Sequence, residues 1–481
     1  MRVLYVSTEL HPALKTGGLA DVNAGLPPAL RAQGADVRLL LPAFPALRAA
    51  AQAPRRRIAL GAMLGCPDVG LLPCRLGAVP TWLIDAPAYY DRPGNPYLDA
   101  SGADWPDNAL RFALLGAVAA RFADGGIGRW RPHVVHGHDW HAGLAPAYLA
   151  ARGGARPASV FTVHNLSYQG HFAAESFDDL GLPAHFFAID GVEYHGGVNF
   201  MKAGLHFADR ITTVSPTYAA EIQTADYGCG MEGVLHARAG ALLGILNGID
   251  TRVWDPAQDP ALAAPFTRAA PAGKRACRAA LLAAAGLAGD AAGPVLGVVS
   301  RLTAQKGLDL LRAAVAPLLA ADGRVVLLGS GDAGEEAAWQ ALARAHPGTV
   351  AVRVGYDETY AHRIFAGADA VAVPSRFEPC GLTQMYAMLY GALPLVRRTG
   401  GLADTVSDGP DGTGFVFDAA ELPALQAALA RLLQSWAEPA RWQAMQARAM
   451  GADFGWARAA RRYLALYREL RPQADPPPTP A

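Results

Sequence analysis

The sequence predicts an α/β protein with two domains, each built around a parallel sheet. Strand-like and helix-like stretches alternate through both halves of the 481-residue chain, a length that allows roughly two to four domains. The expected strands are continuous apolar runs rather than clean alternations, which is typical of strands buried on both faces. The hexapeptide Thr-Gly-Gly-Leu-Ala-Asp occurs once in each half, at Thr16–Asp21 and at Thr399–Asp404.

In the first half, the apolar runs predict parallel strands joined by right-handed crossovers. The expected strands are Val3–Ser7, Asp36–Leu41, His133–His136, Ser159–Val163, Ile211–Val214 and Leu242–Leu246. The helices between them include Asp21–Gln33, Ala109–Phe122, Ala142–Ala151, Asn199–Phe207 and Pro216–Ile222. The segment Arg55–Asp85 is rich in β-type residues but less regular.

The second half shows the same alternation of expected strands and helices. The expected strands are Val295–Ser300, Arg324–Gly329, Thr349–Val354, Ala370–Pro374, Leu393–Val396 and Gly414–Phe417, with helices beginning near Lys306, Gly334, Asp357, Gly381, Leu402 and Leu422. We expect an N-terminal domain over residues 1–246 and a C-terminal domain over 247–455, with a helix over 456–470 that packs back on the first. The proline-rich tail 471–481 is expected to be disordered.

The composition excludes several classes of partner. Forty-two basic residues balance forty-two acidic ones, so we expect neither nucleic acid nor an anionic membrane as a partner. No segment approaches the ~20 apolar residues of a membrane span, and the N-terminus runs into a strand without a secretory leader. The five cysteines contain no Cys-x-x-Cys pair, which favours reduced thiols in a cytoplasmic protein.

The first glycine pair follows Lys15, one of only four lysines in an arginine-rich chain. Adjacent glycines allow a close backbone approach, and the helix that follows points its N–H groups at the turn. The loop matches neither the Walker pattern nor Gly-x-Gly-x-x-Gly. Two interpretations remain open: a phosphate-binding loop carrying Lys15, or a surface turn that caps a helix.

Two further segments follow strands of the second half. Arg301 and Lys306 can neutralise a departing diphosphate, or they can simply be solvated at the start of a helix. Glu378 precedes an expected helix start, where it can accept bonds from sugar hydroxyls or act as an ordinary helix cap. Gly381–Thr383 offer N–H groups to a phosphate, and Cys380 is interpreted as a small packing residue.

A fourth segment, His136–His141, is followed by Val163–Leu166. Histidine and aspartate are good metal ligands, but the histidines at positions 136 and 138 flank a strand end and no closed ligand set is present. A polar wall for an acceptor substrate is therefore favoured over a metal site, and structural histidines are the remaining alternative.

Together these segments resemble the bacterial glycogen synthase and plant starch synthase family over nearly the whole chain. The matching segments are Lys15–Asp21, His138–His141, Thr162–Asn165, Lys202–Leu205, Val214–Tyr218, Gly228–Gly233, Asn247–Asp250, Ser300–Gly307, Pro374–Gln384 and Arg398–Val406. The resemblance implies a GT-B fold, in which two Rossmann-like domains face each other across a cleft. It also implies retaining transfer of glucose from ADP-glucose to the non-reducing end of an α-1,4-glucan in glycogen biosynthesis, with no metal and no cofactor.

The resemblance also implies roles for individual residues. Ligands of the ADP phosphates would be Lys15, Gly18, Arg301 and Lys306, with the loop Cys380, Gly381, Leu382 and Thr383 also on the donor side. Tyr356 would stack on adenine, and Glu378, His164 and Asn247 would bind glucose. Residues at the donor–acceptor boundary would be Asp139, Tyr97 and Asn165. The residues expected to be catalytic are Glu378, Arg301, Lys306 and Asp139.

Two positions depart from the pattern that the resemblance implies. Tyr386 stands where many GT-B enzymes carry a second glutamate, so no carboxylate is available there for the ribose. Cys229 stands where a larger, often aromatic residue is expected, which bears on the packing of the acceptor side.

The mechanism and the activity have alternatives. A retaining transfer can use double displacement, with carboxylates about 5 Å apart, or front-side attack. The sequence offers no convincing carboxylate pair, which favours front-side attack. Rival activities are a sucrose- or trehalose-phosphate-type synthase, a phosphorylase and a silent glucan- or ADP-glucose-binding protein. The Lys15 motif argues against the sucrose- and trehalose-phosphate-type synthases. A phosphorylase would need a lysine that holds pyridoxal phosphate, and no lysine is in such a setting. A silent binding protein is expected to have lost charge at Arg301, Lys306 or Glu378, and all three are present.

Overall fold

The chain divides into two compact units. The computed structural model describes residues 1–470 except 124, 126, 128, 129 and 290. Unit 1 comprises Met1–Val214, Ala219–Gly248 and the chain from Trp456, and unit 2 comprises Ser215–Tyr218 and Ile249–Gly455. The expected boundary after residue 246 lies two positions before this division, and the grouping of Ser215–Tyr218 with unit 2 was not expected. The tail 471–481 lies outside the described residues.

Within the described residues, unit 1 has a nine-stranded sheet in the order β12-β11-β7-β6-β1-β2-β5-β4-β3. Its strands are β1 (Arg2–Val6), β2 (Asp36–Pro42), β3 (Ile58–Met63), β4 (Cys66–Leu76), β5 (Val79–Asp85), β6 (Val134–His138), β7 (Ala158–Val163), β11 (Arg210–Thr213) and β12 (Leu242–Gly244). All neighbouring pairs are parallel except β3–β4 and β4–β5. The strand order reverses between β1 and β6, and open α/β sheets bind ligands outside the carboxyl ends of strands at such a point.

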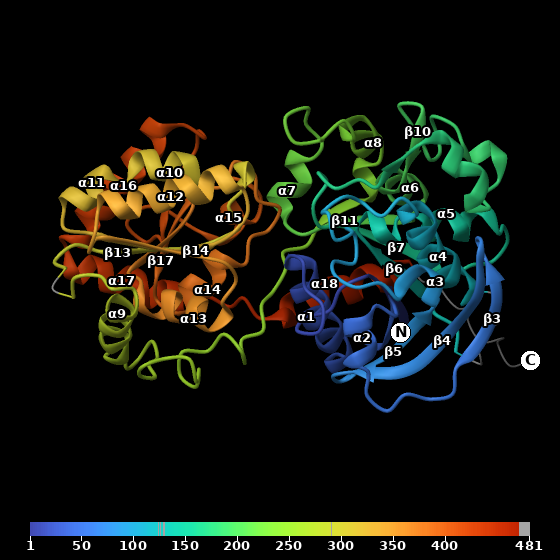
Figure 1. Ribbon diagram of the computed structural model, residues 1–481, viewed down its shortest axis with the longest axis horizontal. Coiled ribbons are helices and arrows are strands. Elements are labelled where there is room, and N and C mark those ends of the chain that lie inside the picture. The colour runs from blue at the N-terminus through green and yellow to red at the C-terminus, as the bar shows by residue number, and fades with distance from the viewer. Residues whose placement is uncertain (124, 126, 128–129, 290, 471–481) are drawn as a thin grey trace, which may run out of the picture. The chain divides into compact units, whose positions relative to one another are not determined.

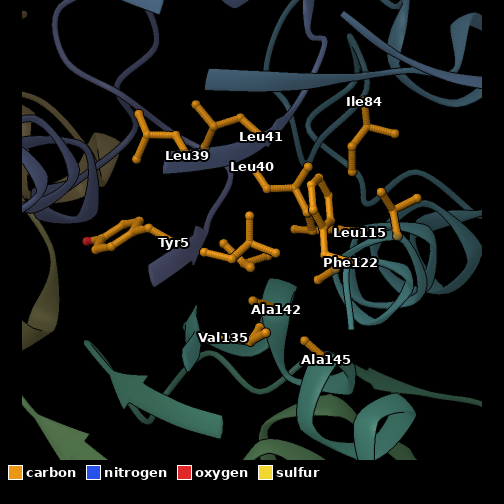
Figure 2. Close-up of a cluster of buried hydrophobic side chains, with 14 of the residues drawn as sticks. Tyr5, Leu39, Leu40, Leu41, Ile84, Leu115, Phe122, Val135, Ala142 and Ala145 are labelled. Carbon is orange, nitrogen blue, oxygen red and sulfur yellow. The ribbon is translucent and has the colours of Figure 1, made fainter. Parts of the chain in front are cut away.

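The core of unit 1 lies between this sheet and its helices. The helices are α1 (Gly18–Ala32), α2 (Pro45–Ala49), α3 (Pro87–Tyr90), α4 (Asn108–Arg121), α5 (Leu144–Ala151), α6 (Phe200–Phe207), α8 (Glu232–Ala237) and α18 (Trp456–Glu469). The residues of α7 (Pro216–Glu221) are divided between the two units. Short 3₁₀ turns cover Trp140–Ala142, Ala174–Leu180, Ala184–Phe186 and Ala239–Ala241. Figure 2 shows apolar side chains of the sheet, such as Leu40 and Val135, meeting Leu115 of α4 and Ala145 of α5.

A small antiparallel sheet was not expected from the sequence. It joins β8 (His171–Phe172), β10 (Gly197–Asn199) and β9 (Glu193–Tyr194). Strands of two or three residues are too short to show the alternation that identifies a strand in a sequence.

Helix α18 packs against α1, as Figure 1 also shows. A Cβ at Gly25 of α1 would collide with the indole ring of Trp456, so this close approach requires glycine. Near the other end of α18, the hydroxyl of Tyr467 bonds Nδ1 of His136 at 2.7 Å. Residues from both ends of the chain therefore build the same unit.

In the described part of unit 2, six parallel strands lie in the order β15-β14-β13-β16-β17-β18. They are β13 (Val295–Val299), β14 (Arg324–Gly329), β15 (Val350–Val354), β16 (Ala370–Val373), β17 (Leu393–Arg397) and β18 (Phe415–Phe417). The order reverses between β13 and β16, so the loops after these two strands lie where a ligand site is expected.

Helices cover both faces of this second sheet. Figure 1 shows α10 (Leu308–Ala314), α11 (Ala316–Ala320), α12 (Ala333–Ala345) and α16 (Leu422–Trp436) on one face, and α9 (Gly273–Ala284), α13 (Glu358–Gly367), α14 (Thr383–Leu389) and α17 (Pro439–Met450) on the other. Helix α15 (Gly400–Thr405) follows β17, and Ala304–Lys306 forms a 3₁₀ turn. In the described part of the chain, none of the helices combines the length and apolar character that crossing a membrane requires.

Candidate active site

Three loops meet at the carboxyl ends of β13, β16 and β17 in unit 2. Gly307 has φ +63°, and a Cβ there would collide with the carbonyl oxygen of Pro374. Gly400 has φ +42°, and a Cβ there would collide with the carbonyl oxygen of Glu378. The N–H of Gly401 also donates to the carbonyl of Glu378 at 3.2 Å. These glycines let the neighbouring loops fix the backbone around Glu378.

The carboxylate of Glu378 is buried and paired. Its Oε2 accepts a hydrogen bond from Nζ of Lys306 at 2.6 Å and from Oγ of Ser375 at 2.8 Å. The helix that follows begins at Thr383, and its cap residue, Leu382, makes no side-chain capping bond. Within the described residues the carboxylate of Glu378 bonds Lys306 and Ser375, and no hydrogen bond supports the alternative that it caps this helix.

The two candidate cations of this unit are in different environments. Lys306 is partly buried beside Glu378, with the two side chains 17% and 8% exposed. The Arg301 side chain is exposed, and within the described residues it makes no hydrogen bond or ion pair. The sequence suggested two equivalent phosphate ligands, whereas one of them is already held by a carboxylate and the other is available to solvent.

The loop before α14 also carries the other residues predicted for the donor. Gly381 has φ +69°, and a Cβ there would lie 3.1 Å from Cγ of Glu378. Cys380 is buried, in line with its interpretation as a packing residue. Leu382 and Thr383 stand at the start of α14. One loop therefore carries both the Glu378 carboxylate and the main-chain groups that are predicted to bind the donor.

Tyr356 lies two residues after β15, and its ring is 72% exposed. Its hydroxyl donates to Oε2 of Glu358 at 2.7 Å. A large aromatic ring this exposed at the carboxyl end of a parallel strand is suited to stacking on a flat ligand.

In unit 1, the first hexapeptide follows β1 and opens α1. Nζ of Lys15 pairs with Oδ1 of Asp21 at 2.9 Å. Gly17 has φ −161°, and a Cβ at Gly17 or Gly18 would meet no atom within 4 Å. The local packing therefore does not require these glycines, and space is left beside the N-terminus of α1. The second copy differs, because Gly400 and Gly401 are packed against main-chain atoms.

Asp139 joins the ends of two neighbouring strands. It follows β6 with φ +56°, and its Oδ1 accepts the main-chain N–H of His164 at 2.7 Å and of Asn165 at 3.4 Å. Both donors follow β7. Burial raises the pKa of Asp139 to about 7, against the lowering effect of these two hydrogen bonds.

The histidines around Asp139 are neutral at pH 7. Nδ1 of His138 bonds Nε2 of His164 at 2.9 Å, and the His138 ring stacks on Tyr5 at 3.9 Å between centroids. Burial lowers the pKa of His164 and that of His141 to about 3. His136 bonds Thr162 and Tyr467 in the core, which gives it a structural role. No group of three or more His, Cys, Asp or Glu side chains among the described residues could hold a metal ion.

Two other predicted site residues also belong to unit 1. Tyr97 stacks on His141 with ring centroids 4.4 Å apart, and its hydroxyl donates to Oε1 of Glu9 at 2.5 Å. Asn247 is buried, and its Oδ1 has no hydrogen-bond partner within the described part of the protein.

Glu9, which accepts the hydroxyl of Tyr97, was not predicted as a site residue, because a single glutamate after a strand belongs to no recognisable motif.

The two positions that depart from the family pattern lie in different environments. The ring of Tyr386 stacks on Trp254 at 3.8 Å and 19°, so it fills space within unit 2. Cys229 is exposed with φ +50°, and its carbonyl accepts Nε2 of Gln169 at 2.9 Å.

Comparison with known proteins agrees with the resemblance seen in the sequence. Residues 2–237 match the family model described as "Starch synthase catalytic domain", and residues 293–435 match "Glycosyl transferases group 1". The chain is 52% identical to the glycogen synthase of Leptothrix cholodnii and 53% identical to that of Yersinia pestis. Each alignment covers 98% of this chain and 100% of the relative.

Solved structures give the same result. The catalytic domain of starch synthase IV from Arabidopsis thaliana, bound to ADP and acarbose, superposes with a TM-score of 0.88 at 31% identity, covering 98% of this chain and 99% of that one. A sucrose-phosphate synthase from Thermosynechococcus elongatus, at 19% identity and a TM-score of 0.60, covers 98% of each chain and shares the fold alone. The chain therefore belongs to the glycogen synthase and starch synthase family of glucosyltransferases, and it has the GT-B fold that the sequence predicts.

Proposed function

We propose that this protein is a glycogen synthase that transfers glucose from ADP-glucose to the non-reducing end of an α-1,4-glucan with retention of configuration. Full-length identity of about half to bacterial glycogen synthases supports this activity, as does the likeness to a starch synthase bound to ADP. The observation that carries it is the ion pair between partly buried Lys306 and buried Glu378 at the reversal point of the second sheet.

On the donor side, we assign the ADP phosphates to cations and main-chain N–H groups. The exposed guanidinium of Arg301 and the ammonium of Lys306 suit the charge that grows on a departing diphosphate. The assigned phosphate ligands are Lys15, Gly18, Arg301, Lys306 and the loop Cys380–Thr383. Tyr356 is assigned to adenine.

The sugar and the acceptor are assigned to polar groups that can form new hydrogen bonds. Glu378, neutral His164 and the unpartnered Oδ1 of Asn247 are assigned to glucose hydroxyls. Asp139, Tyr97 and Asn165 are assigned to the boundary between donor and acceptor.

We favour front-side attack over double displacement. In this scheme the bond between C1 of glucose and the β-phosphate oxygen breaks first, giving an oxocarbenium-like ion pair. The 4-OH of the acceptor forms the new bond to C1 on the same face, and its proton passes to the departing phosphate. Glu378 and Asp139 stabilise positive charge on the sugar, and the cations stabilise negative charge on ADP.

An elongation assay tests the proposed activity. The purified chain is incubated with glycogen and either ADP-glucose or UDP-glucose, with and without EDTA. We expect ADP-linked glucose to enter α-1,4 linkages at an unchanged rate in EDTA. In a parallel reaction with fructose 6-phosphate in place of glycogen, transfer to the sugar phosphate would favour a sucrose-phosphate-type synthase. No transfer to glycogen from either donor would refute the proposed function.

We also propose that the reaction takes place in the cytoplasm. All five cysteines are free thiols, which is the usual state of cysteine in a reducing compartment.

Removing the Tyr356 ring should weaken donor binding. Stacking of a base on an aromatic side chain contributes about 1–3 kcal/mol, so Tyr356→Ala should raise the KM for ADP-glucose about tenfold or more with kcat little changed. Because the ring is exposed, Tm should not move. Tyr356→Phe keeps the ring and should restore KM, which steady-state kinetics at saturating glycogen can check. An unchanged KM in the alanine variant would contradict the assignment.

Asp139 should make stability depend on pH. Its pKa of about 7 in the folded protein lies above the ~3.9 of an unfolded chain, so the folded state holds the proton more tightly. The stability that this proton contributes is complete below about pH 4 and is lost as pH rises through 7. Asp139→Asn cannot ionise and retains an oxygen for the N–H of His164.

We therefore expect the Tm of Asp139→Asn, relative to that of the parent, to rise as the pH increases from about 4 to about 7. At pH 8 the variant should remain the more stable of the two. Its kcat should fall, because the charge that faces the sugar is gone. Melting curves of both proteins from pH 4 to pH 8 measure the difference. A Tm difference that does not change with pH would contradict the raised pKa.

A further inference from the structure

Glu9 is a buried carboxylate that the proposed reaction does not use directly. It lies three residues after the end of β1 and is 2% exposed. Its Oε2 accepts the main-chain N–H of Thr16 at 2.6 Å, and its Oε1 accepts the hydroxyl of Thr16 at 2.6 Å and that of Tyr97 at 2.5 Å. One side chain therefore contacts both the Lys15–Gly18 loop and Tyr97.

The main chain of Glu9 is fixed independently of these contacts. Its carbonyl accepts Nδ2 of Asn23, a buried residue of α1, at 2.8 Å. The same Nδ2 donates to Oγ of Ser7 at 2.7 Å, and Oδ1 of Asn23 accepts the hydroxyl of Tyr5 at 2.8 Å. The carboxylate therefore extends from a rigid base on β1 and α1.

The two glycines at the tip of the loop that Glu9 holds are not packed against other atoms. A Cβ at Gly17 or Gly18 would meet no atom within 4 Å, so these two residues are not confined by packing. Thr16 itself is exposed. Its two bonds to Glu9 fix the residue between Lys15 and the glycines.

The carboxylate has no ion-pair partner among the described residues; hydrogen-bond donors from the loop and Tyr97 satisfy it instead. Burying a carboxylate costs free energy, and hydrogen bonds offset part of that cost. These hydrogen bonds also fix the geometry of the groups that donate them, because such charge-assisted bonds are short and strong.

We propose that Glu9 is a positioning residue that holds Thr16, and with it Lys15 and Gly18, in fixed register with the Tyr97 hydroxyl. This inference rests on the proposed function, since Lys15 and Tyr97 are assigned there to the donor phosphates and to the donor–acceptor boundary. Glu9 acts through these residues and does not touch the substrate. Its carboxylate couples the donor side to the acceptor side within unit 1.

Glu9→Gln tests the role because glutamine keeps the shape but presents an NH₂ group to donors. The main-chain N–H or the hydroxyls then lose an acceptor. We expect kcat/KM for ADP-glucose to fall about 10- to 100-fold. Hydrogen exchange in the ligand-free protein should speed up in the peptide that contains Thr16, whatever the reaction of the protein is.

Thr16→Val is a second variant that avoids the core. The side chain is exposed, so the variant should fold, and it loses the Oγ1 bond while keeping the N–H bond. We expect a smaller loss in kcat/KM, about 3- to 10-fold. Asp85→Asn is the matched control, since it also removes a buried carboxylate from unit 1, one bound to Arg57 at 2.5 Å. It should lower Tm and leave both kinetics and exchange at Thr16 unchanged.

A double-mutant cycle shows whether Glu9 acts through the loop. If it does, Glu9→Gln should cost much less in the Lys15→Ala background than in the parent. Full additivity, or parent-like exchange at Thr16 in Glu9→Gln, would overturn the positioning role. If the parent itself does not use ADP-glucose, the proposed function fails, and the exchange measurement still decides whether Glu9 holds the loop.

Discussion

Replacing Glu378 by glutamine should lower kcat at least about 100-fold while the KM for the sugar nucleotide barely moves. Glutamine keeps the size of the side chain and an oxygen for the hydroxyl of Ser375, but it loses the negative charge. If that charge faces the sugar as positive charge builds on it, the interaction is made chiefly in the transition state, and its loss appears in kcat. Steady-state kinetics at saturating glycogen measure the effect.

Glu421→Gln provides the control for Glu378→Gln, because it makes the same chemical change at an exposed position just before α16. It should leave kcat unchanged. Near-normal turnover of Glu378→Gln with a lowered Tm would show that Glu378 serves only as the structural partner of Lys306.

Replacing Lys306 by alanine should lower kcat about 10²- to 10³-fold. Loss of one preorganised donor to charge that develops in a transition state typically costs about 2.7–4 kcal/mol. The substitution should also lower Tm, because it leaves the charge of the buried Glu378 carboxylate without its cation. Kinetics and melting curves on the same preparation separate the two effects.

Lys306→Arg tests whether any positive charge is sufficient. The planar guanidinium is larger than an ammonium group, and the turn around Lys306 is tight, with Gly307 packed on Pro374. We expect reduced turnover. Arg344→Ala removes an exposed cation from α12 and should have no effect. Unchanged kinetics in Lys306→Ala would make Lys306 a residue without a part in the reaction.

The parallel strands were predictable because their signal is local. β13, β14 and β16 are continuous apolar runs, and their observed bounds agree with the expected ones within one residue. Strands β4 and β3 extend the sheet of unit 1, and the sequence predicted them only as an irregular β-rich segment. Neither strand is a continuous apolar run, and β3 is mostly exposed. Local periodicity is weak where a strand faces solvent.

Two of the four lysines, Lys202 and Lys274, bond main-chain carbonyl groups. Nζ of Lys274 donates to main-chain carbonyls that include those of Ala366, Ala368 and Tyr390, and Lys202 donates to the carbonyls of Ile189 and Glu193. A compact ammonium can satisfy several carbonyls where a planar guanidinium does not fit. Burial lowers the pKa of Lys274 to about 8.

The repeated hexapeptide shows a limit of motif reading. The two copies have the same sequence, yet Gly17 and Gly18 face open space, whereas Gly400 and Gly401 pack on main-chain atoms of the Glu378 loop. The role of a glycine pair depends on residues that follow other strands, and the local sequence does not contain these residues. For the first copy, the phosphate-binding loop stays a prediction.

The pairing within the candidate site could not be predicted for the same reason. Lys306 and Glu378 lie 72 positions apart, and their contact depends on β13 and β16 being neighbours in the sheet. The sequence indicated that each residue follows a strand end. It could not indicate that the two would share one hydrogen bond, nor that Glu9 would hold Thr16.

A double-mutant cycle on kcat with Lys306→Ala, Glu378→Gln and the double variant tests most directly whether this pair forms one charged unit in glucosyl transfer. Part of the loss in Lys306→Ala comes from the uncompensated charge on Glu378, which the second substitution removes. We expect the double variant to lose much less than the product of the two single losses. A loss equal to that product would contradict a single charged unit at the reversal point of the second sheet.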